Sequence, residues 1–247
     1  MPQADLIARL REAHRRSRYT YGSRRLMYQL RRSGIVIGRY RVRRLMRLAG
    51  VSVRKRRRYK TTTHSKHRYP VSANLIQGCF QTIRPNLIWV SDITYIKTVE
   101  GWLYLAVVMD LFSRKIVGWS LERHMKVEIA EAALLMAIGR RQPGTGLIHH
   151  SDRGSQYASY KYRGLLQANG IVSSMSRSGS CLDNAVAERF FHTLKAECLL
   201  NWQDMTASEV RHDIVDYIEM FYNSERLHSY NGYLCPNDYE KRVETLI

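Results

Sequence analysis

The sequence of 247 residues lacks several features by which common classes of protein are recognised. Its four cysteines are scattered and form no C-x-x-C pair, which argues against a disulfide framework or a cysteine-rich zinc site and suits a reducing cytoplasm. No apolar run reaches the ~18–20 residues of a membrane helix, and nothing resembles a signal peptide. A Gly-rich phosphate loop of the G-x-x-x-x-G-K type is also missing, which argues against an ordinary nucleoside triphosphatase. We therefore expect a cytoplasmic protein with no membrane partner.

Acidic residues are nearly missing from one part of the chain. Residues 1–69 carry 22 of the 40 Lys and Arg residues but only two of the 21 acidic ones, Asp5 and Glu12. The net charge of +19 therefore belongs to this part, and residues 70–247 are close to neutral. A polyanion is the natural partner of such a segment. A solvated basic arm without a target is the alternative, but nucleic acid is favoured because many of these cations fall within a helical pattern.

Apolar residues recur at helical spacing in three stretches of the basic part, residues 4–14, 23–34 and 39–50. Ser23 is the expected N-cap of the second helix, and Gly34 is its expected stop. Two short helices with a tight Gly-containing link predict a helix-turn-helix-like DNA-binding domain over residues 1–50, with a generic basic helical hairpin as the alternative. The residues expected to hold DNA here are Arg24, Arg25, Arg39, Arg41, Arg43 and Arg44.

A basic linker is predicted over residues 51–80. It contains five consecutive cations, which should follow a phosphate backbone without reading the base sequence. His64 and His67 have no cysteine pair at ligand spacing, so a zinc site is not expected. The linker residues expected to contact DNA are Arg54, Lys55, Arg56, Arg57, Arg58 and Lys60.

The composition changes after the linker to that of an α/β domain, placed at residues 81–240. Runs of β-branched, aromatic and aliphatic residues predict five strands, at residues 86–96, 101–113, 114–121, 147–151 and 171–176. Helical patterns cover residues 126–141, 157–170, 184–200 and 207–228. Three antiparallel strands followed by alternating strands and helices predict a mixed five-stranded sheet with flanking helices, the plan of ribonuclease-H-like nucleases.

Three carboxylates in this domain fall at unusual positions. Asp92 lies inside the first strand among apolar residues, where an unpaired carboxylate is costly and needs a cation or strong donors. Asp152 follows the fourth strand, and Glu188 lies one turn into the helix 184–200. Such residues can converge on Mg²⁺, which prefers oxygen ligands. Two such ions ~3.5–4 Å apart can activate the attacking oxygen and stabilise the leaving one in phosphodiester cleavage.

Other polar residues in the domain have plainer interpretations. Asp110 is expected to form a turn, and Asp183 or Asn184 to cap the helix 184–200, because residues 183 and 188 would not share a helix face. Glu188, His192 and Lys195 do share a face, at i, i+4 and i+7. Lys195 is therefore either a contact to the scissile phosphate or a solvated helix lysine, and spacing alone favours neither.

The run GLIHHSDRGSQY, residues 146–157, invites comparison with a serine hydrolase. Neighbours in a strand point to opposite faces, so His150 and Ser151 cannot meet as base and nucleophile. Asp152 remains the residue expected to act in chemistry, as a metal ligand. Gly154 is expected to let the chain turn beside a bound phosphate, and Ser155 or Gln156 to cap the next helix or touch DNA.

Five motifs carry a resemblance to a known family: WVSDITYI, LAVVMDLFSRKIVGWS, HHSDRGSQYAS, SRSGSCLDNAVAERFFHTLKAE and YNSERLHSYNGYLCPNDY. They span about residues 86–240, and the third and fourth are very specific together. The chain resembles the DDE transposases of the third bacterial insertion-sequence family, relatives of retroviral integrase. The first 50 residues also resemble the helix-turn-helix-like segment that precedes the core in this family, so nearly the whole chain is covered.

The resemblance implies more than the residues alone. It identifies Asp92, Asp152 and Glu188 as the catalytic and metal-binding triad, and Lys195 as a catalytic residue that contacts DNA phosphate. It implies two Mg²⁺ ions, for which Mn²⁺ substitutes, and double-stranded DNA partners, namely the element's terminal repeats and the target. It also implies a homo-oligomer on paired ends, an upstream-frame DNA-binding protein or fusion partner, and a place at the bacterial nucleoid. The chain resembles the downstream-frame product alone, and it has no His-His-Cys-Cys zinc domain of the retroviral type.

The function expected from these observations is Mg-dependent strand cleavage at element ends and 3′-OH strand transfer by an insertion-sequence transposase. One alternative keeps the fold and makes the protein a DNA nuclease without strand transfer. Another is a non-catalytic DNA-binding regulator of transposition, against which the intact acidic triad argues.

Overall fold

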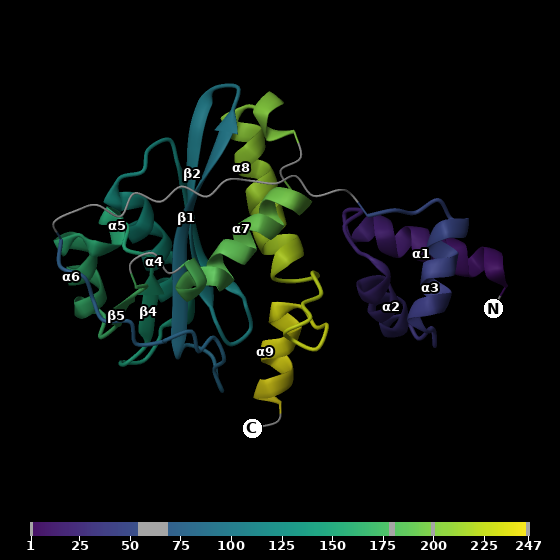
Figure 1. The fold of residues 1–247 in the computed structure, drawn as a ribbon, viewed down its shortest axis with the longest axis horizontal. Helices are drawn as coiled ribbons and strands as arrows, with labels where there is room; N and C mark the ends of the chain where they lie inside the picture. The colour runs from purple at the N-terminus through teal and green to yellow at the C-terminus, as the bar shows by residue number, and fades with distance from the viewer. Residues whose placement is uncertain (1, 54–68, 178–180, 199–200, 246–247) are drawn as a thin grey trace. The chain divides into compact units, whose positions relative to one another are not determined.

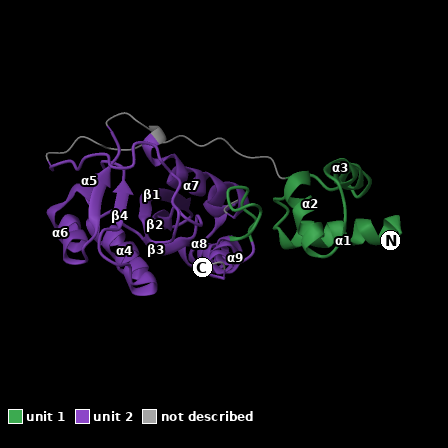
Figure 2. Ribbon diagram, turned by 90° about the horizontal axis from the view of Figure 1, so that it is seen from below, with its two compact units in different colours: residues 1–58, 226–235 green, residues 59–225, 236–247 purple. Residues whose placement is uncertain are grey.

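The protein was analysed as a computed structural model, which describes residues 2–53, 69–177, 181–198 and 201–245. The chain divides into two compact units, shown in Figure 2. The helical unit comprises residues 1–58 and 226–235, and the sheet unit comprises residues 59–225 and 236–247. No helix in the described ranges is long and apolar enough to cross a membrane.

The helical unit contains the three predicted helices, α1 (Gln3–Arg16), α2 (Ser23–Arg32) and α3 (Arg39–Leu48) (Figure 1). Each contributes apolar residues at helical spacing to a small common core, made by Leu6, Leu10, Leu26, Leu30, Val42 and Leu45. The expected N-cap of α2 is wrong by one residue, because Gly22 occupies that position and Ser23 is the first helical residue.

Residues 226–235 complete this unit with contacts to α2 and to the turn before it. The Leu227 amide donates a hydrogen bond of 2.6 Å to the Tyr21 hydroxyl. The ring of Tyr233 stacks on that of Tyr28 with centroids 3.7 Å apart. Leu227 and Tyr21 are both buried, so part of this unit's core comes from a segment about 200 residues downstream of its helices.

The sheet unit is built on the predicted five-stranded sheet, in the order β3-β2-β1-β4-β5. Its first three strands pair antiparallel, and β1, β4 and β5 pair parallel. The mixed sheet and the flanking helices confirm the expected ribonuclease-H-like fold. The strands are β1 (Ile88–Thr98), β2 (Gly101–Asp110), β3 (Ile116–Glu122), β4 (Ile148–Ser151) and β5 (Val172–Met175).

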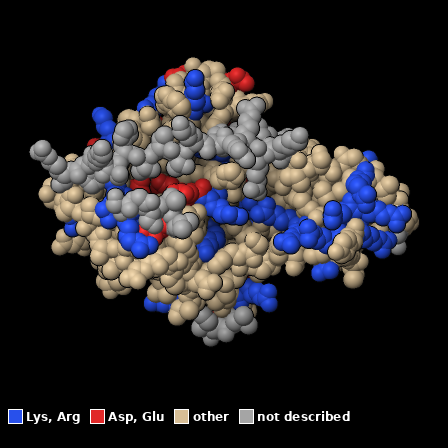
Figure 3. Space-filling view, in the orientation of Figure 1, with Lys and Arg blue, Asp and Glu red and all other residues tan. Residues whose placement is uncertain are grey.

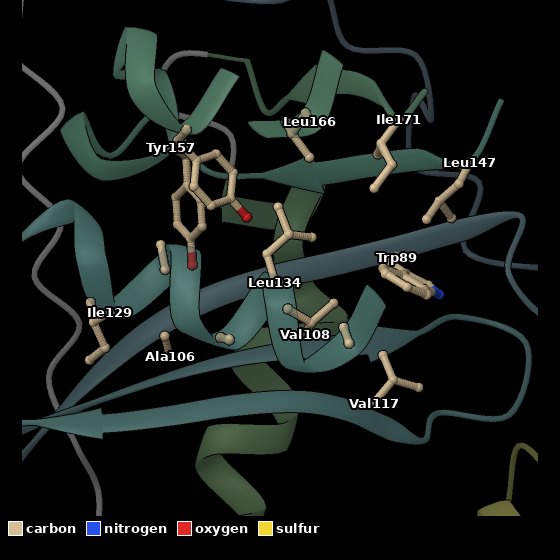
Figure 4. Packing of buried hydrophobic residues seen from close by; sticks show 14 of the residues in the cluster. Trp89, Ala106, Val108, Val117, Ile129, Leu134, Leu147, Tyr157, Leu166 and Ile171 are labelled. Atoms are coloured by element: carbon tan, nitrogen blue, oxygen red, sulfur yellow. The ribbon is translucent and has the colours of Figure 1, made fainter. Parts of the chain in front are cut away.

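One face of the sheet is covered by α4 (Val127–Arg141), α5 (Ser155–Ala158) and α6 (Tyr160–Ala168). Figure 4 shows the apolar core between them, where Trp89 and Val108 of the sheet pack with Leu134 of α4. The single helix expected at residues 157–170 is therefore wrong. The chain breaks at Ser159, whose extended backbone ends α5 and whose hydroxyl accepts the Tyr162 amide to cap α6.

A glycine in β3 allows α4 to pack directly on the sheet. A Cβ at Gly118 would overlap the carbonyl oxygen of Ala133 and lie 2.8 Å from the Ala137 Cβ. Because the atoms it would meet are mostly backbone, no side-chain movement can make room. This close approach explains why the third strand carries a glycine in a run of β-branched and aromatic residues.

The remaining helices are α7 (Ala185–Glu197), which packs against β1, then α8 (Ala207–Val215) and α9 (Pro236–Glu244). Short turns precede α7 and α8, namely η1 (Cys181–Asn184) and η2 (Trp202–Asp204). The single helix predicted over residues 207–228 is only partly right. After α8 the chain continues as a π-helical segment, η3 (Asp216–Tyr222), which ends six residues before the predicted limit. The helix α9 was not predicted.

Candidate active site

The sheet register brings Asp92 and Asp152 to equivalent positions on neighbouring strands. Ser91 of β1 pairs with Ser151 of β4 in the parallel register, and each aspartate follows its serine by one residue. Glu188 lies in the first turn of α7, the helix that packs against β1. Strand, strand end and helix therefore supply the three carboxylates in the arrangement that the sequence predicts.

The pKa values show that these carboxylates act on one another. Desolvation raises the pKa of Asp92 well above its usual range, and the charges of Asp152 and Glu188 raise it further. The amide of Ile93 and the ammonium of Lys195 act in the opposite direction. Burial and the charge of Asp152 also raise the pKa of Glu188. Repulsion between neighbouring carboxylates of this kind is relieved by a bound cation.

In the described parts of the chain, no three His, Cys, Asp or Glu side chains lie close enough together to hold a metal ion as they stand. The three carboxylates therefore lie within electrostatic range of one another without already enclosing a coordination sphere. Their donor chemistry nevertheless fits a hard divalent cation, because all three groups offer oxygen only.

Lys195 is held by aromatic rings. Its ammonium lies 5.1 Å from the ring centroid of Tyr95 and 5.6 Å from that of Trp202, both within range for cation–π attraction. Burial lowers the pKa of Lys195 to about 8, although the charge of Asp92 raises it. A fully solvated lysine, one of the two interpretations of its spacing, does not fit this environment. His192, on the same helix, is exposed.

Gly154 lies against the Asp152 carboxylate. Its amide donates to Asp152 Oδ1 at 2.9 Å, and a Cβ here would lie 3.0 Å from the same oxygen. The glycine adopts an ordinary extended conformation as the N-cap of α5, so the turn closed by this hydrogen bond needs no left-handed backbone, and the missing side chain serves the close approach to the carboxylate. The expected place beside a bound phosphate stays a prediction. Neither Ser155 nor Gln156 caps this helix. Ser155 begins it, and the Gln156 amide donates to the Met125 carbonyl at 2.9 Å.

The two histidines of GLIHHSDRGSQY are buried beside the site and do not pair with Ser151. Their hydrogen bonds join His149 Nε2 to Ser91 Oγ (2.7 Å) and Tyr162 Oη (3.0 Å), and His150 to Ser174 Oγ (2.8 Å) and Ser176 Oγ (3.2 Å). Burial lowers the pKa of His149 to about 3 and that of His150 to about 4, so both rings are neutral near pH 7. The hydrolase comparison gains no support from these contacts.

Two residues expected as helix caps have other contacts. Asn184 occupies the N-cap position of α7, but its side chain makes no capping hydrogen bond. Its Nδ2 instead donates to the Ser91 carbonyl at 3.2 Å. The buried Asp183 carboxylate accepts from the Arg177 amide and from Asn74 Nδ2, both at 2.9 Å. Asp183 therefore orders the turn before α7.

Asp110 is a buried structural carboxylate. It accepts the Phe112 amide at 2.9 Å, as its predicted turn role requires, and the Asn86 amide at 2.8 Å. It also pairs with Arg141 at 3.0 Å, and the same guanidinium bonds to Glu240 at 2.7 Å. Arg141 and Glu240 were not anticipated, because they lie 99 positions apart and no local pattern links them.

Six of the basic residues expected to contact DNA lie in the described part of the helical unit, and five of these six are exposed. Arg25 is half-buried, with its guanidinium 5.5 Å from the Tyr21 ring centroid. Figure 3 shows Lys and Arg atoms spread over this unit, and Asp and Glu atoms gathered in a patch on the sheet unit. The linker residues from Arg54 to Arg58, and Lys60, lie outside the described residues. The exposed members of the set are Arg24, Arg39, Arg41, Arg43 and Arg44.

Comparisons with known proteins match these units to recognised domains. Residues 2–59 match an HTH-like domain, and residues 83–181 and 188–243 match integrase core domains. A chain of the simian T-cell lymphotropic virus intasome, solved in complex with PP2A regulatory subunit B56 gamma, aligns with a TM-score of 0.55. That alignment covers 72% of this chain and 60% of the viral one at 18% identity, so it supports the fold alone. Fold and matches together define a protein with an integrase-type catalytic core.

Sequence relatives give the family. The chain is 42% identical to the insertion element IS600 31 kDa protein of Shigella sonnei, covering 96% of this chain and 87% of that protein. It is 40% identical to the transposase InsF for insertion sequence IS3A of Escherichia coli, covering 93% and 80%. A transposase for element IS904 of Lactococcus lactis is 43% identical, covering 90% and 87%. The chain belongs to the IS3 family of insertion-sequence transposases.

Proposed function

We propose that this transposase cuts one DNA strand at each end of its element and joins the freed 3′-OH to target DNA, using Asp92, Asp152 and Glu188. The observation that carries the proposal is the placement of these residues, since Asp92 and Asp152 follow paired serines on neighbouring strands and Glu188 lies in the first turn of the helix that packs against β1. Burial and the charges of Asp152 and Glu188 raise the pKa of Asp92, which the charge of Lys195 lowers, and burial and the charge of Asp152 raise the pKa of Glu188. Holding three like charges close together costs free energy, and a bound cation offsets this cost. Such clusters are therefore typical of functional sites.

We infer that the three carboxylates hold two Mg²⁺ ions, for which Mn²⁺ substitutes. Their oxygen donors suit these hard cations. Bound Mg²⁺ supplies Lewis acidity toward the phosphodiester and a lowered pKa for water. The carboxylates contribute fixed negative charge at set positions and no covalent intermediate. Lys195, restrained by its two aromatic neighbours, is positioned to hold the scissile phosphate as a charge-assisted donor.

DNA binding is assigned mainly to the helical unit and the linker. The exposed arginines of α2 and α3 would neutralise phosphates of double-stranded terminal repeats and target DNA. We further propose that two or more copies bridge paired ends, with an upstream-frame protein or fusion supplying further DNA binding. The place of action would be the nucleoid in the cytoplasm.

The test is cleavage and joining of a labelled element end by the purified chain. Wild type should cut only with Mg²⁺ or Mn²⁺ present, and chelation should stop it. Asp92→Asn, Asp152→Asn and Glu188→Gln should each lower the rate about 1000-fold or more, because several kcal/mol of stabilisation is lost at about tenfold per 1.4 kcal/mol. DNA affinity should stay near that of wild type. Glu122→Gln at the end of β3, outside the carboxylate site, is the matched control.

The alternatives separate in the same assay. Joining of a pre-cut 3′-OH donor by wild type would exclude a nuclease without strand transfer. A wild-type chain that binds element ends but never cuts them with either cation would favour a regulatory role. Near-normal strand transfer by any of the three carboxylate variants would overturn the site assignment.

A further inference from the structure

Asn184 stands at a helix start without acting as a cap. Asparagine is common at this position because its side-chain oxygen accepts an amide from the first helical turn. Here no such bond forms, and Asn184 Oδ1 is buried without a hydrogen-bond partner in the described structure. A buried oxygen left without a hydrogen-bond partner is destabilising. Asn184 therefore lacks the capping hydrogen bond that usually stabilises a helix start, so helix stability alone does not explain an asparagine at this position.

The other end of the amide links two of the three carboxylate-bearing elements. Asn184 Nδ2 donates to the carbonyl of Ser91, the residue directly before Asp92 on β1. Asn184 is also four positions, about one helical turn, before Glu188 on α7. A single buried hydrogen bond of 3.2 Å thus ties the backbone beside Asp92 to the start of the helix that carries Glu188.

The third carboxylate is tied to the same turn. Ser151, directly before Asp152, accepts the Ser176 amide at 2.9 Å, and the Arg177 amide that follows donates to Asp183, the neighbour of Asn184, also at 2.9 Å. His149 on β4 bonds to the Ser91 hydroxyl at 2.7 Å. Polar contacts therefore connect β1, β4 and the start of α7 within one to four residues of each carboxylate.

We propose that Asn184 is a positioning residue that sets the distance of Glu188 from Asp92 and thereby the affinity of the carboxylate site for divalent cations. The inference rests on the proposed function of that site. Residues behind metal ligands fix ligand orientation, and their loss typically lowers metal affinity or activity about 10–100-fold. Asn184 would act through Glu188 and Asp92 without touching the ion.

Asn223 provides a matched control in the same unit. It is also buried, and its side chain both donates to the Ile116 carbonyl and accepts the Ile116 amide, at 2.9 and 3.0 Å. Ile116 begins β3, which is separated from β1 by β2. Asn223→Ala therefore removes two strand-anchoring hydrogen bonds at a distance from the carboxylates, whereas Asn184→Ala removes one beside them.

The experiment measures Mn²⁺ binding to the full chain by the electron paramagnetic resonance signal of the free ion, with and without element-end DNA. Asn184→Ala should weaken Mn²⁺ binding about 10–100-fold and raise the Mg²⁺ concentration for half-maximal cleavage to match. At saturating Mg²⁺ the cleavage rate of Asn184→Ala should return toward that of wild type. Its affinity for DNA should equal that of wild type throughout. Asn223→Ala should lower the melting temperature at least as much as Asn184→Ala while leaving Mn²⁺ binding unchanged.

A second variant guards against misfolding. Asn184→Leu keeps the number and branching of the side-chain heavy atoms, so it leaves no cavity, and it also removes the unpartnered oxygen. It should show the same loss of Mn²⁺ affinity. Unchanged Mn²⁺ affinity in either variant, or a loss no greater than that of Asn223→Ala, overturns the positioning role alone. If wild type binds Mn²⁺ no better than Asp92→Asn does, the proposed cation site falls and this inference with it.

Discussion

The helices α2 and α3 of the helical unit and the core of the sheet unit use charge in opposite ways. In the helical unit, arginines of α2 and α3 lie at the surface over an apolar core, and the acids there are Asp5 and Glu12. In the sheet unit, charged and polar groups are buried in pairs and networks, as at Asp110, Arg141 and Glu240. Exposed cations act on a polyanion through solvent, where salt screens them. Buried groups act over short distances at fixed geometry, where their effect is stronger.

This difference predicts which substitutions should have large effects on activity or stability. Each surface arginine would be one of several similar contacts to DNA phosphates, so the other arginines would retain most of the affinity when one is removed. A buried polar residue has specific partners, and its loss leaves one of them unsatisfied. Substitutions in the sheet unit should therefore change chemistry or stability sharply, whereas those in the helical unit should change DNA affinity in small, salt-dependent steps.

The largest effect tests Lys195, a partly buried cation of the sheet unit. Lys195→Met keeps most of the side-chain volume against Tyr95 and Trp202 but removes the charge. If the ammonium holds the scissile phosphate, cleavage should slow about 100–1000-fold, as for loss of one preorganised donor. The measurement is single-turnover cleavage at saturating DNA. A rate within a few-fold of wild type would show that Lys195 serves packing only, and Lys97→Met on β1 is the control.

The next effect tests how tightly α4 packs on the sheet. Gly118→Ala places a methyl group on the backbone of α4, at Ala133 and Ala137. Because backbone must move, we expect a loss of about 3 kcal/mol in the free energy of unfolding, the upper part of the range for overpacked cores. Denaturant unfolding measures it. Gly139→Ala, at an open position of α4 itself, should be neutral or slightly stabilising. Equal stability of both variants would contradict the close approach.

Much of the fold follows from local sequence patterns. Strands β1 to β5 and helices α1 to α4 are runs whose periodicity and end signals agree with their tertiary surroundings. The errors occur where tertiary contacts override a continuous helical pattern. The helix predicted over residues 157–170 is broken at Ser159. The helix predicted over residues 207–228 continues after α8 as the π-helical segment η3. Pro236, a favoured first residue of a helix, could have indicated α9.

The candidate site divides in the same way. Asp92 is visible in the sequence because a carboxylate is rare inside an apolar strand, and Asp152 and Glu188 are visible because they stand in motifs that resemble those of the family. The residues around these three carboxylates cannot be predicted from the sequence, because they come from segments that are far apart in the chain. Asn184 has the right residue type for a helix cap, but its side chain is recruited by Ser91, 93 positions earlier. No local sequence rule predicts whether the Asn184 side chain caps α7 or bonds to the Ser91 carbonyl.

A buried ion network offers a pH-dependent test. Burial alone would raise the pKa of Glu240, but hydrogen bonds and charge from Arg141, with Ser113 and Lys115, hold it below its ordinary value. A depressed carboxyl pKa contributes stability that is present above the unfolded-state pKa and is lost as pH falls through the folded-state pKa. Glu240→Gln should therefore cost about 2 kcal/mol near pH 7, as for lost charged hydrogen bonds, and less below about pH 4.

Thermal or urea unfolding from pH 7 to pH 3 measures this. The stabilities of variant and wild type should converge as the pH falls, which makes the variant's pH profile the flatter one. Asp110 also binds Arg141, but burial raises its pKa, so its contribution has the opposite sign and remains in both proteins. Parallel profiles, with a constant difference at every pH, would contradict the assigned shift of Glu240.

The smallest effect tests the helical unit. Arg43→Ala removes one exposed cation from α3, and we expect DNA affinity to fall evenly for all sequences and the slope of log affinity against log salt to drop by about 1. Fluorescence anisotropy over a salt series measures both. Arg16→Ala in the same unit is the control, because Arg16 is paired with Glu12 at 2.9 Å and should leave the slope unchanged. If Arg43→Ala weakened binding strongly for one DNA sequence and little for others, Arg43 would read bases, and the contrast between a diffuse helical unit and a specific sheet unit would fail at that residue.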